Sequence, residues 1–217
     1  MTTNDWHDVD GLLTGLFVGA DPALDRTLAA NAAGGLPPID VSPAQGKFLH
    51  LLARMSGARR ILEIGTLGGY STIWLARALP AGGELTTCEF NPVHAEVAAA
   101  NIAHAGFGDR VDIRVGAALD TLATLTGPYD FVFIDADKPN NANYVREAVR
   151  LSRPGTVIVV DNVVRAGHIL DAEPDANARG ALDMFALVAA DTRLTATTVQ
   201  TVGAKGWDGF TLIRVND

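Results

Sequence analysis

The sequence contains little cysteine and little positive charge. Its one cysteine, Cys88, cannot form a disulfide within the chain, which fits a reducing compartment. With 17 Lys and Arg against 25 Asp and Glu, the formal net charge is −8. This charge argues against a nucleic-acid partner, because such partners are bound largely through Lys and Arg. It also makes binding to an anionic membrane surface unfavourable.

Long apolar runs are missing as well. None approaches the roughly 18 residues that a membrane-spanning helix needs. Residues 1–5 end in an acid, Asp5, where a secretory signal peptide would have positive charge. We therefore expect a cytoplasmic protein with no membrane partner.

Apolar residues are abundant, at 48% against 19% charged, so the chain can bury a sizeable core. Runs of strand length recur about 20 to 30 residues apart, the spacing of alternating β-strands and α-helices. Several runs are apolar almost throughout, as strands covered on both faces should be. They are residues 61–64, 84–89, 111–115, 131–134 and 156–160. The sequence thus predicts an α/β fold with a mostly parallel sheet.

Capping residues indicate where two helices begin. Ser42 followed by Pro43 and Gln45 is typical of a helix start. The face that we expect this helix to bury consists of Phe48, Leu51, Leu52 and Met55. Asn91 and Pro92 open a second helix, which we expect to end near Ala105.

The end of the chain departs from this alternation. Two β-rich runs, 194–202 and 210–215, are joined by residues 203–209, too few for a crossover helix, so we expect an antiparallel pair. No shift in composition marks a domain boundary. We therefore expect a single domain over residues 1–217, in which residues 1–40 form an N-terminal helical cap.

A glycine-rich turn follows the first strand, between Glu63 and Ser71. In an open parallel sheet, ligands bind beyond the carboxyl ends of the strands, where the strand order reverses. Glycine lets the backbone approach a ligand, and the following helix start offers free N–H groups. Glu89 ends the second strand, where a carboxylate can accept both hydroxyls of a ribose. These features indicate a nucleoside-bearing cofactor; the alternative is a structural turn beside a solvated acid.

The spacing in this turn disfavours a dinucleotide. The fingerprint G-x-G-x-x-G needs glycine where this chain has Leu67 and a small residue where it has Tyr70. Glu63 would repel a diphosphate but could attract a cationic amino acid group. The P-loop pattern is absent from the sequence as well. A nucleoside with a positively charged tail fits better than NAD.

Oxygen-bearing side chains follow two further strands. Asp135 comes after the fourth strand, and Asp161 and Asn162 come after the fifth. If these strands are neighbours, the three side chains converge. Two carboxylates and one amide oxygen are typical ligands of Mg²⁺, Mn²⁺ or Ca²⁺. Ordinary polar strand ends are the alternative.

Three segments together resemble the signature segments of the cation-dependent O-methyltransferases, the group that contains catechol and caffeoyl-CoA O-methyltransferases. They are residues 63–71, 131–138 and 160–163, and the resemblance extends from about Val41 to the end of the chain. It is strongest to bacterial members. It implies a Rossmann-like class I methyltransferase fold, with a seven-stranded, mostly parallel sheet, an antiparallel last strand and helices on both faces. It also implies S-adenosylmethionine, usually Mg²⁺, an aromatic substrate with vicinal hydroxyls, and a homodimer.

The resemblance assigns roles to individual residues. Lys138 would be the general base and Asp135 a second catalytic residue. The metal ligands would be Asp135, Asp161 and Asn162. Glu89 would hold the ribose of the cofactor, and Ala118 would lie against its adenine. The full set of cofactor-binding positions would be Val41, Ser42, Glu63, Gly65, Thr66, Ser71, Glu89, Ala118, Asp135 and Asp137.

These roles describe one reaction, in which a chelated catechol hydroxyl loses its proton to Lys138 and attacks the sulfonium methyl group. An NAD-dependent oxidoreductase and a non-catalytic cofactor-binding protein are the alternatives. Residues 167–177 have the composition of a loop and are a candidate lid. Lys205 and Trp207 either line the mouth of the pocket or close the last hairpin. We expect surface or packing roles for the five histidines, which are His7, His50, His94, His104 and His168.

Overall fold

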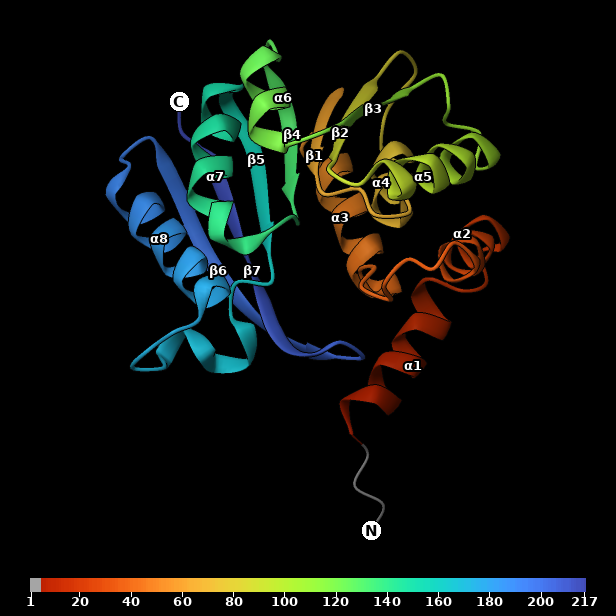
Figure 1. Ribbon diagram of the computed structural model, residues 1–217, viewed down its shortest axis with the longest axis horizontal. Coiled ribbons are helices and arrows are strands. Elements are labelled where there is room, and N and C mark those ends of the chain that lie inside the picture. The colour runs from red at the N-terminus through yellow and green to blue at the C-terminus, as the bar shows by residue number, and fades with distance from the viewer. Residues whose placement is uncertain (1–4) are drawn as a thin grey trace.

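In the computed structural model, which describes residues 5–217, one sheet forms the middle of the molecule (Figure 1). Its strands are β1 (Arg60–Ile64), β2 (Glu84–Glu89), β3 (Val111–Val115), β4 (Tyr129–Ile134), β5 (Ser152–Asp161), β6 (Leu194–Gly203) and β7 (Gly206–Val215). Their order across the sheet is β3-β2-β1-β4-β5-β7-β6. β1 to β5 pair in parallel, whereas β7 is antiparallel to both of its neighbours. The predicted α/β fold is therefore confirmed, including the antiparallel last strand.

Helices cover both faces of this sheet (Figure 1). One face packs against α3 (Pro43–Met55), α4 (Tyr70–Ala76) and α5 (Pro92–His104). The other packs against α6 (Ala118–Thr124), α7 (Asn141–Arg150) and α8 (Ala176–Ala190). Outside these layers, α1 (Trp6–Phe17) contacts α3, and α2 (Pro22–Ala33) contacts α4 and α5. The short helices η1 (Lys138–Asn140) and η2 (Arg165–Leu170) follow β4 and β5. Among residues 5–217, no helix is both long and apolar enough to cross a membrane.

The central strands are apolar throughout because each of their faces is covered. Along β4, Val132 and Ile134 enter the core beneath α6, α7 and α8. Phe131 and Phe133 point the other way, into the core beneath α3, α4 and α5. All four side chains are fully buried, so polar and apolar residues do not alternate along this part of the strand.

The start of α3 is predicted correctly, and its buried face is predicted in part. Ser42 caps the helix by accepting a hydrogen bond from the backbone N–H of Gln45 at 3.2 Å. The residues that α3 buries fully are Gly46, Leu49 and Ala53. Met55 is 81% exposed, and Leu51 is exposed as well. Leu52 packs partly buried against the core, and the ring of Phe48 lies against Phe210. Trp74 lies so close to Gly46 that any Cβ there would overlap its ring, so α3 needs glycine at this contact.

The start and end predicted for α5 are confirmed, whereas the final hairpin is longer than predicted. α5 begins after Asn91 and ends at His104. β6 and β7 remain paired as far as Gly203 opposite Gly206, so only Ala204 and Lys205 form the turn. The predicted seven-residue connection over 203–209 is wrong because these residues continue the ladder, and Gly206 takes the left-handed backbone (φ +87°) that a tight turn requires.

Candidate active site

Two adjoining cavities open at the carboxyl ends of β1, β4 and β5, where the strand order reverses. The glycine-turn cavity has a volume of about 820 Å³ and lies over the segment after β1 and the end of β2. The hairpin cavity, of about 450 Å³, lies between the start of α3 and the β6–β7 turn. Residues that line both cavities form their boundary, and they are Ile39, Asp40, Val41, Asp135, Asn162 and Arg165.

The glycine turn is shaped by contacts that only particular residues allow. Gly65 has φ +102°, and a Cβ on it would overlap the carbonyl oxygen of Asp135. Oε2 of Glu89 accepts hydrogen bonds from the backbone N–H groups of Thr66 and Leu67 at 3.2 and 2.8 Å. The other oxygen, Oε1, accepts one from Asn91 N at 2.9 Å. Glu89 therefore holds the turn in place from the end of β2.

Glu63 lies behind the cavity wall rather than on it. Its side chain is fully buried and accepts hydrogen bonds from the hydroxyls of Ser71 (2.6 Å), Thr87 (2.8 Å) and Thr72. Burial raises the pKa of Glu63 to about 7, and the hydroxyl hydrogen bonds oppose this rise only in part. Ser71 lines the glycine-turn cavity and Glu63 lines neither cavity, so this acid reaches the cavity only through Ser71.

The remaining predicted cofactor positions are distributed over the two cavities. Thr66 and Ala118 line the glycine-turn cavity, and Ser42 lines the hairpin cavity. Asp137 also lines the glycine-turn cavity, where it accepts hydrogen bonds from Asn140 Nδ2 (2.6 Å) and from the hydroxyl of Tyr144. Burial and the neighbouring Asp137 carboxylate raise the pKa of Tyr144, so its hydroxyl remains a donor.

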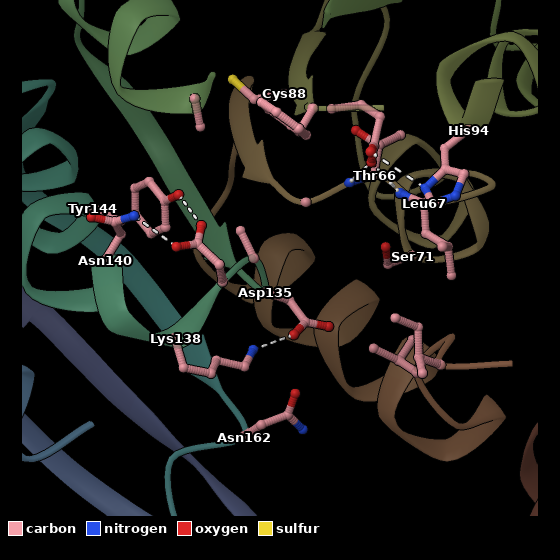
Figure 2. A pocket seen from close by; sticks show the side chains of 18 of the residues that line it. Thr66, Leu67, Ser71, Cys88, His94, Asp135, Lys138, Asn140, Tyr144 and Asn162 are labelled. Carbon is pink, nitrogen blue, oxygen red and sulfur yellow. Dashed lines mark hydrogen bonds and ion pairs between the residues drawn. The ribbon is translucent and has the colours of Figure 1, made fainter. Parts of the chain in front are cut away.

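The predicted oxygen ligands and the lysine are grouped around the boundary: Asp135 and Asn162 line both cavities, Lys138 lines the glycine-turn cavity, and Asp161 lines the hairpin cavity. β4 and β5 are adjacent and in register, with Ile134 opposite Val160, so Asp135 and Asp161 follow neighbouring positions. The amino group of Lys138 lies 2.6 Å from Oδ1 of Asp135 (Figure 2). Gln45 Nε2 donates to Oδ2 of Asp161 at 2.6 Å.

The two aspartates repel each other. Burial, and then the charge of Asp135, raise the pKa of Asp161 to about 7. Asn162 follows with a left-handed backbone (φ +55°), and it lines the glycine-turn cavity together with Asp135 and Lys138. In the part of the chain that the structure describes, no group of three or more His, Cys, Asp or Glu side chains is placed to hold a metal. The donor set is two carboxylates and one amide oxygen, which suits a hard divalent cation.

The sequence analysis expected a surface or packing role for His94 and did not place it at the site. His94 lines the glycine-turn cavity, with Nδ1 3.5 Å from Oε1 of Glu89 (Figure 2). Its position in the first turn of a helix that begins directly after β2 was the available signal, because such a turn lies beside the strand ends. Tyr144 and Asp40 are lining residues that the sequence analysis also missed.

Three other expectations concerned loops and the hairpin. Lys205 lines the hairpin cavity. Trp207 closes the hairpin instead, since its Nε1 donates to Gln200 Oε1 at 2.9 Å and its ring lies against Gly167. Within 167–177, Asn177 lines the glycine-turn cavity, and the role of this segment as a lid stays a prediction.

Comparisons with known proteins agree with this site. A family model described as O-methyltransferase matches residues 21–215. A Mycobacterium tuberculosis protein named catechol O-methyltransferase is 56% identical over 209 residues, covering 96% of this chain and 95% of that protein. The O-methyltransferase from Bacillus cereus, solved in complex with SAH, has a TM-score of 0.95 and 50% identity, covering 97% of this chain and 98% of that one. TomG from Streptomyces achromogenes, an O-methyltransferase solved with SAM, has a TM-score of 0.95 and 49% identity over 100% of each chain.

Proposed function

Since this chain belongs to the O-methyltransferase family, we propose that it transfers the methyl group of S-adenosylmethionine to one hydroxyl of a catechol-like small molecule, with the help of a divalent cation. The observation that supports this most is the grouping of Asp135, Asp161, Asn162 and Lys138 around the boundary between two cavities. One cavity can hold the methyl donor and the other the acceptor, so the reacting groups would meet where these four side chains lie.

The glycine-turn cavity suits the methyl donor. S-adenosylmethionine supplies an electrophilic methyl group on a positively charged sulfur. Glu89 ends β2 beside this cavity and would accept the ribose hydroxyls, and Ala118 would lie against the adenine. Val41, Gly65 and Ser71 would surround the amino acid portion, with Glu63 orienting the Ser71 hydroxyl from behind.

A divalent cation, preferably Mg²⁺, fits the oxygen donors of Asp135, Asp161 and Asn162. When bound, it would acidify a chelated hydroxyl and fix the acceptor ring in place. The two carboxylates repel each other across a buried site, and a cation would relieve that repulsion. Gln45 holds Asp161 from the side of α3 and would fix the orientation of this ligand.

Lys138 is the proposed general base. Its side chain is only 9% exposed and is held beside the boundary by Asp135. From there its amino group would accept the proton of the acceptor hydroxyl, and the resulting oxyanion would attack the methyl carbon in line with the departing sulfur. Alignment of the two substrates by the cavity walls would supply much of the rate increase. No observation favours NAD, because Leu67 occupies a position where its fingerprint needs glycine.

The test is turnover of catechol, with S-adenosylmethionine and Mg²⁺, before and after addition of EDTA. We expect EDTA to abolish methylation and excess Mg²⁺ to restore it. Phenol, which has one hydroxyl, should be methylated far more slowly than catechol. Turnover that EDTA leaves intact would contradict the role of the cation, and equal rates on the two rings would contradict chelation.

The proposal includes pairing with a second copy of the chain. α1 buries none of its side chains, although it is rich in large apolar residues. Trp6, Val9, Leu12, Leu13, Leu16 and Phe17 are all exposed. A patch of this kind is typical of a protein interface. Sedimentation should show a dimer that Leu12→Glu with Leu16→Glu converts to monomer; a monomeric wild type would contradict the pairing.

A further inference from the structure

Arg165 has unused hydrogen-bonding capacity at the boundary of the two cavities. Arg165 lines both cavities, and its side chain is 31% exposed. The nearest carboxylate oxygen, Oδ2 of Asp208, lies 3.9 Å from Nη1, which is beyond hydrogen-bond distance. Within residues 5–217 the guanidinium donates no hydrogen bond, although the backbone N–H of Arg165 does. The planar fork of donors is therefore available to a ligand.

The backbone at this position is held in a conformation that arginine does not favour. Arg165 has φ +56° and Ala166 has φ +52°, both in the left-handed region. That region is unfavourable for an ordinary side chain, and Gly or Asn adopts it more easily. Oδ1 of Asp208 fixes the segment by accepting hydrogen bonds from Val164 N (3.0 Å) and Arg165 N (2.9 Å). Strain of this kind clusters at functional sites.

The hairpin cavity has several carboxylates, but each already has a partner within the chain. Asp161 accepts a hydrogen bond from Gln45, Asp135 is paired with Lys138, and Asp208 accepts from backbone N–H groups. Asp40 accepts from Asn31 Nδ2 at 2.9 Å, and Asp10 accepts from Ala204 N at 2.7 Å. The second cation of the cavity, Lys205, donates to the carbonyl of Pro38 at 3.2 Å. Arg165 is thus the lining cation that lacks a hydrogen-bond partner for its charged group.

We infer that Arg165 is a specificity residue, which binds a carboxylate carried by the acceptor ring. The preferred acceptors are then aromatic vicinal diols that bear an acidic substituent. This inference rests on the proposed function, since it assigns the hairpin cavity to the acceptor. A guanidinium and a carboxylate form two parallel hydrogen bonds, which neither an ester nor an unsubstituted ring can reproduce.

The test compares kcat/KM for 3,4-dihydroxybenzoate with that for its methyl ester, which has the same ring but no charge. We expect the wild type to favour the acid, and Arg165→Asn to lower the acid-to-ester ratio by about tenfold or more, chiefly through KM. Asn suits the left-handed backbone, so this variant should fold. Arg165→Lys should restore part of the preference. Arg146→Asn, on the exposed side of α7, is the matched control and should keep the wild-type ratio.

Binding gives a second readout. Calorimetric titration of 3,4-dihydroxybenzoate into protein loaded with Mg²⁺ and S-adenosylhomocysteine should show weaker binding to Arg165→Asn. An unchanged acid-to-ester ratio and affinity in this variant would overturn the inference. So would loss of the preference in Lys205→Gln alone, or a wild type that prefers dopamine to the acid. Failure of the wild type to methylate any of these diols would instead contradict the proposed function itself.

Discussion

The amino group of Lys138 lies 2.6 Å from Oδ1 of Asp135, three residues earlier in the chain. One residue is the proposed base and the other a proposed metal ligand, and η1 begins at Lys138 directly after the segment that leaves β4. The contact, drawn as a dashed line in Figure 2, keeps a nearly buried lysine on the wall of the glycine-turn cavity, beside a residue that lines both cavities. One short segment would thus supply both the base and a ligand of the cation, and both would act on the same acceptor oxygen.

Replacement of Lys138 by Ala should reduce kcat by about 10²- to 10⁴-fold, the usual contribution of a positioned acid or base. Binding of S-adenosylhomocysteine, measured by calorimetry, should persist because the glycine turn is untouched. Lys47→Ala is the control, since Lys47 lies on α3 over Trp74 and lines neither cavity. A Lys138→Ala enzyme with nearly normal kcat would show that another group removes the proton.

Gln45→Ala should weaken activation by Mg²⁺ by about 10- to 100-fold, as loss of a residue that orients a metal ligand usually does. The cause is the lost hydrogen bond to Oδ2 of Asp161. Titration of Mg²⁺ against turnover measures the effect. Gln200→Ala is the control, because Gln200 contacts Trp207 in the hairpin. Identical Mg²⁺ dependence in the wild type and Gln45→Ala would contradict the role given to Gln45.

Gly65→Ala should destabilise the fold more than Gly106→Ala. Both glycines have positive φ, but a Cβ at position 106 meets open space whereas one at position 65 overlaps the Asp135 carbonyl. We expect a loss of about 1 kcal/mol for the strain at Gly106 alone and a larger loss at Gly65. Urea denaturation measures both. Equal losses would mean that the close approach of the turn to Asp135 does not matter.

Glu63 should make the free protein less stable as the pH rises. The pKa of its carboxyl group is about 7 in the fold against an ordinary value of 4.5, so the folded state holds the proton more tightly. Its contribution to stability is therefore complete below pH 4.5 and is lost as the pH passes about 7, by at most about 3 kcal/mol.

The matched variant for this effect is Glu63→Gln, which stays neutral. The difference between wild-type and variant unfolding free energies at pH 5 and pH 8, measured in EDTA, isolates Glu63, because Asp161 contributes to both proteins. We expect the variant to lose less stability than the wild type over this range. A pH dependence that is the same in both would contradict the raised pKa.

Much of the fold could be predicted because burial on both faces marks the central strands in the sequence. The β4 run from Phe131 to Ile134 shows this, since its side chains pack into the core on each face of the sheet. The buried face of α3 could be predicted only in part. It includes the approach of Gly46 to Trp74, a contact between segments that hydrophobic periodicity does not report.

The residues of the candidate site also divide into those that the sequence predicts and those that depend on the folded structure. Strand-end residues such as Asp135 and Asp161 could be predicted, because parallel strands bring their carboxyl ends to one edge. Arg165 could not, since its place in the cavity walls depends on a left-handed backbone after β5. His94 was overlooked, although its position in the first turn of α5 was a signal in the sequence. Glu63 was expected to bind the cofactor, and the sequence does not show that three hydroxyls enclose its carboxylate.

The most direct test of the account is a count of divalent ions bound per chain. Mn²⁺ bound to the protein in the presence of S-adenosylhomocysteine can be measured by electron paramagnetic resonance, for the wild type and for Asp161→Asn. The account predicts one Mn²⁺ per wild-type chain, displaced by Mg²⁺, and binding weakened at least about tenfold in the variant. A wild type that binds no Mn²⁺, or an Asp161→Asn variant that binds it equally well, would contradict the proposed cation site.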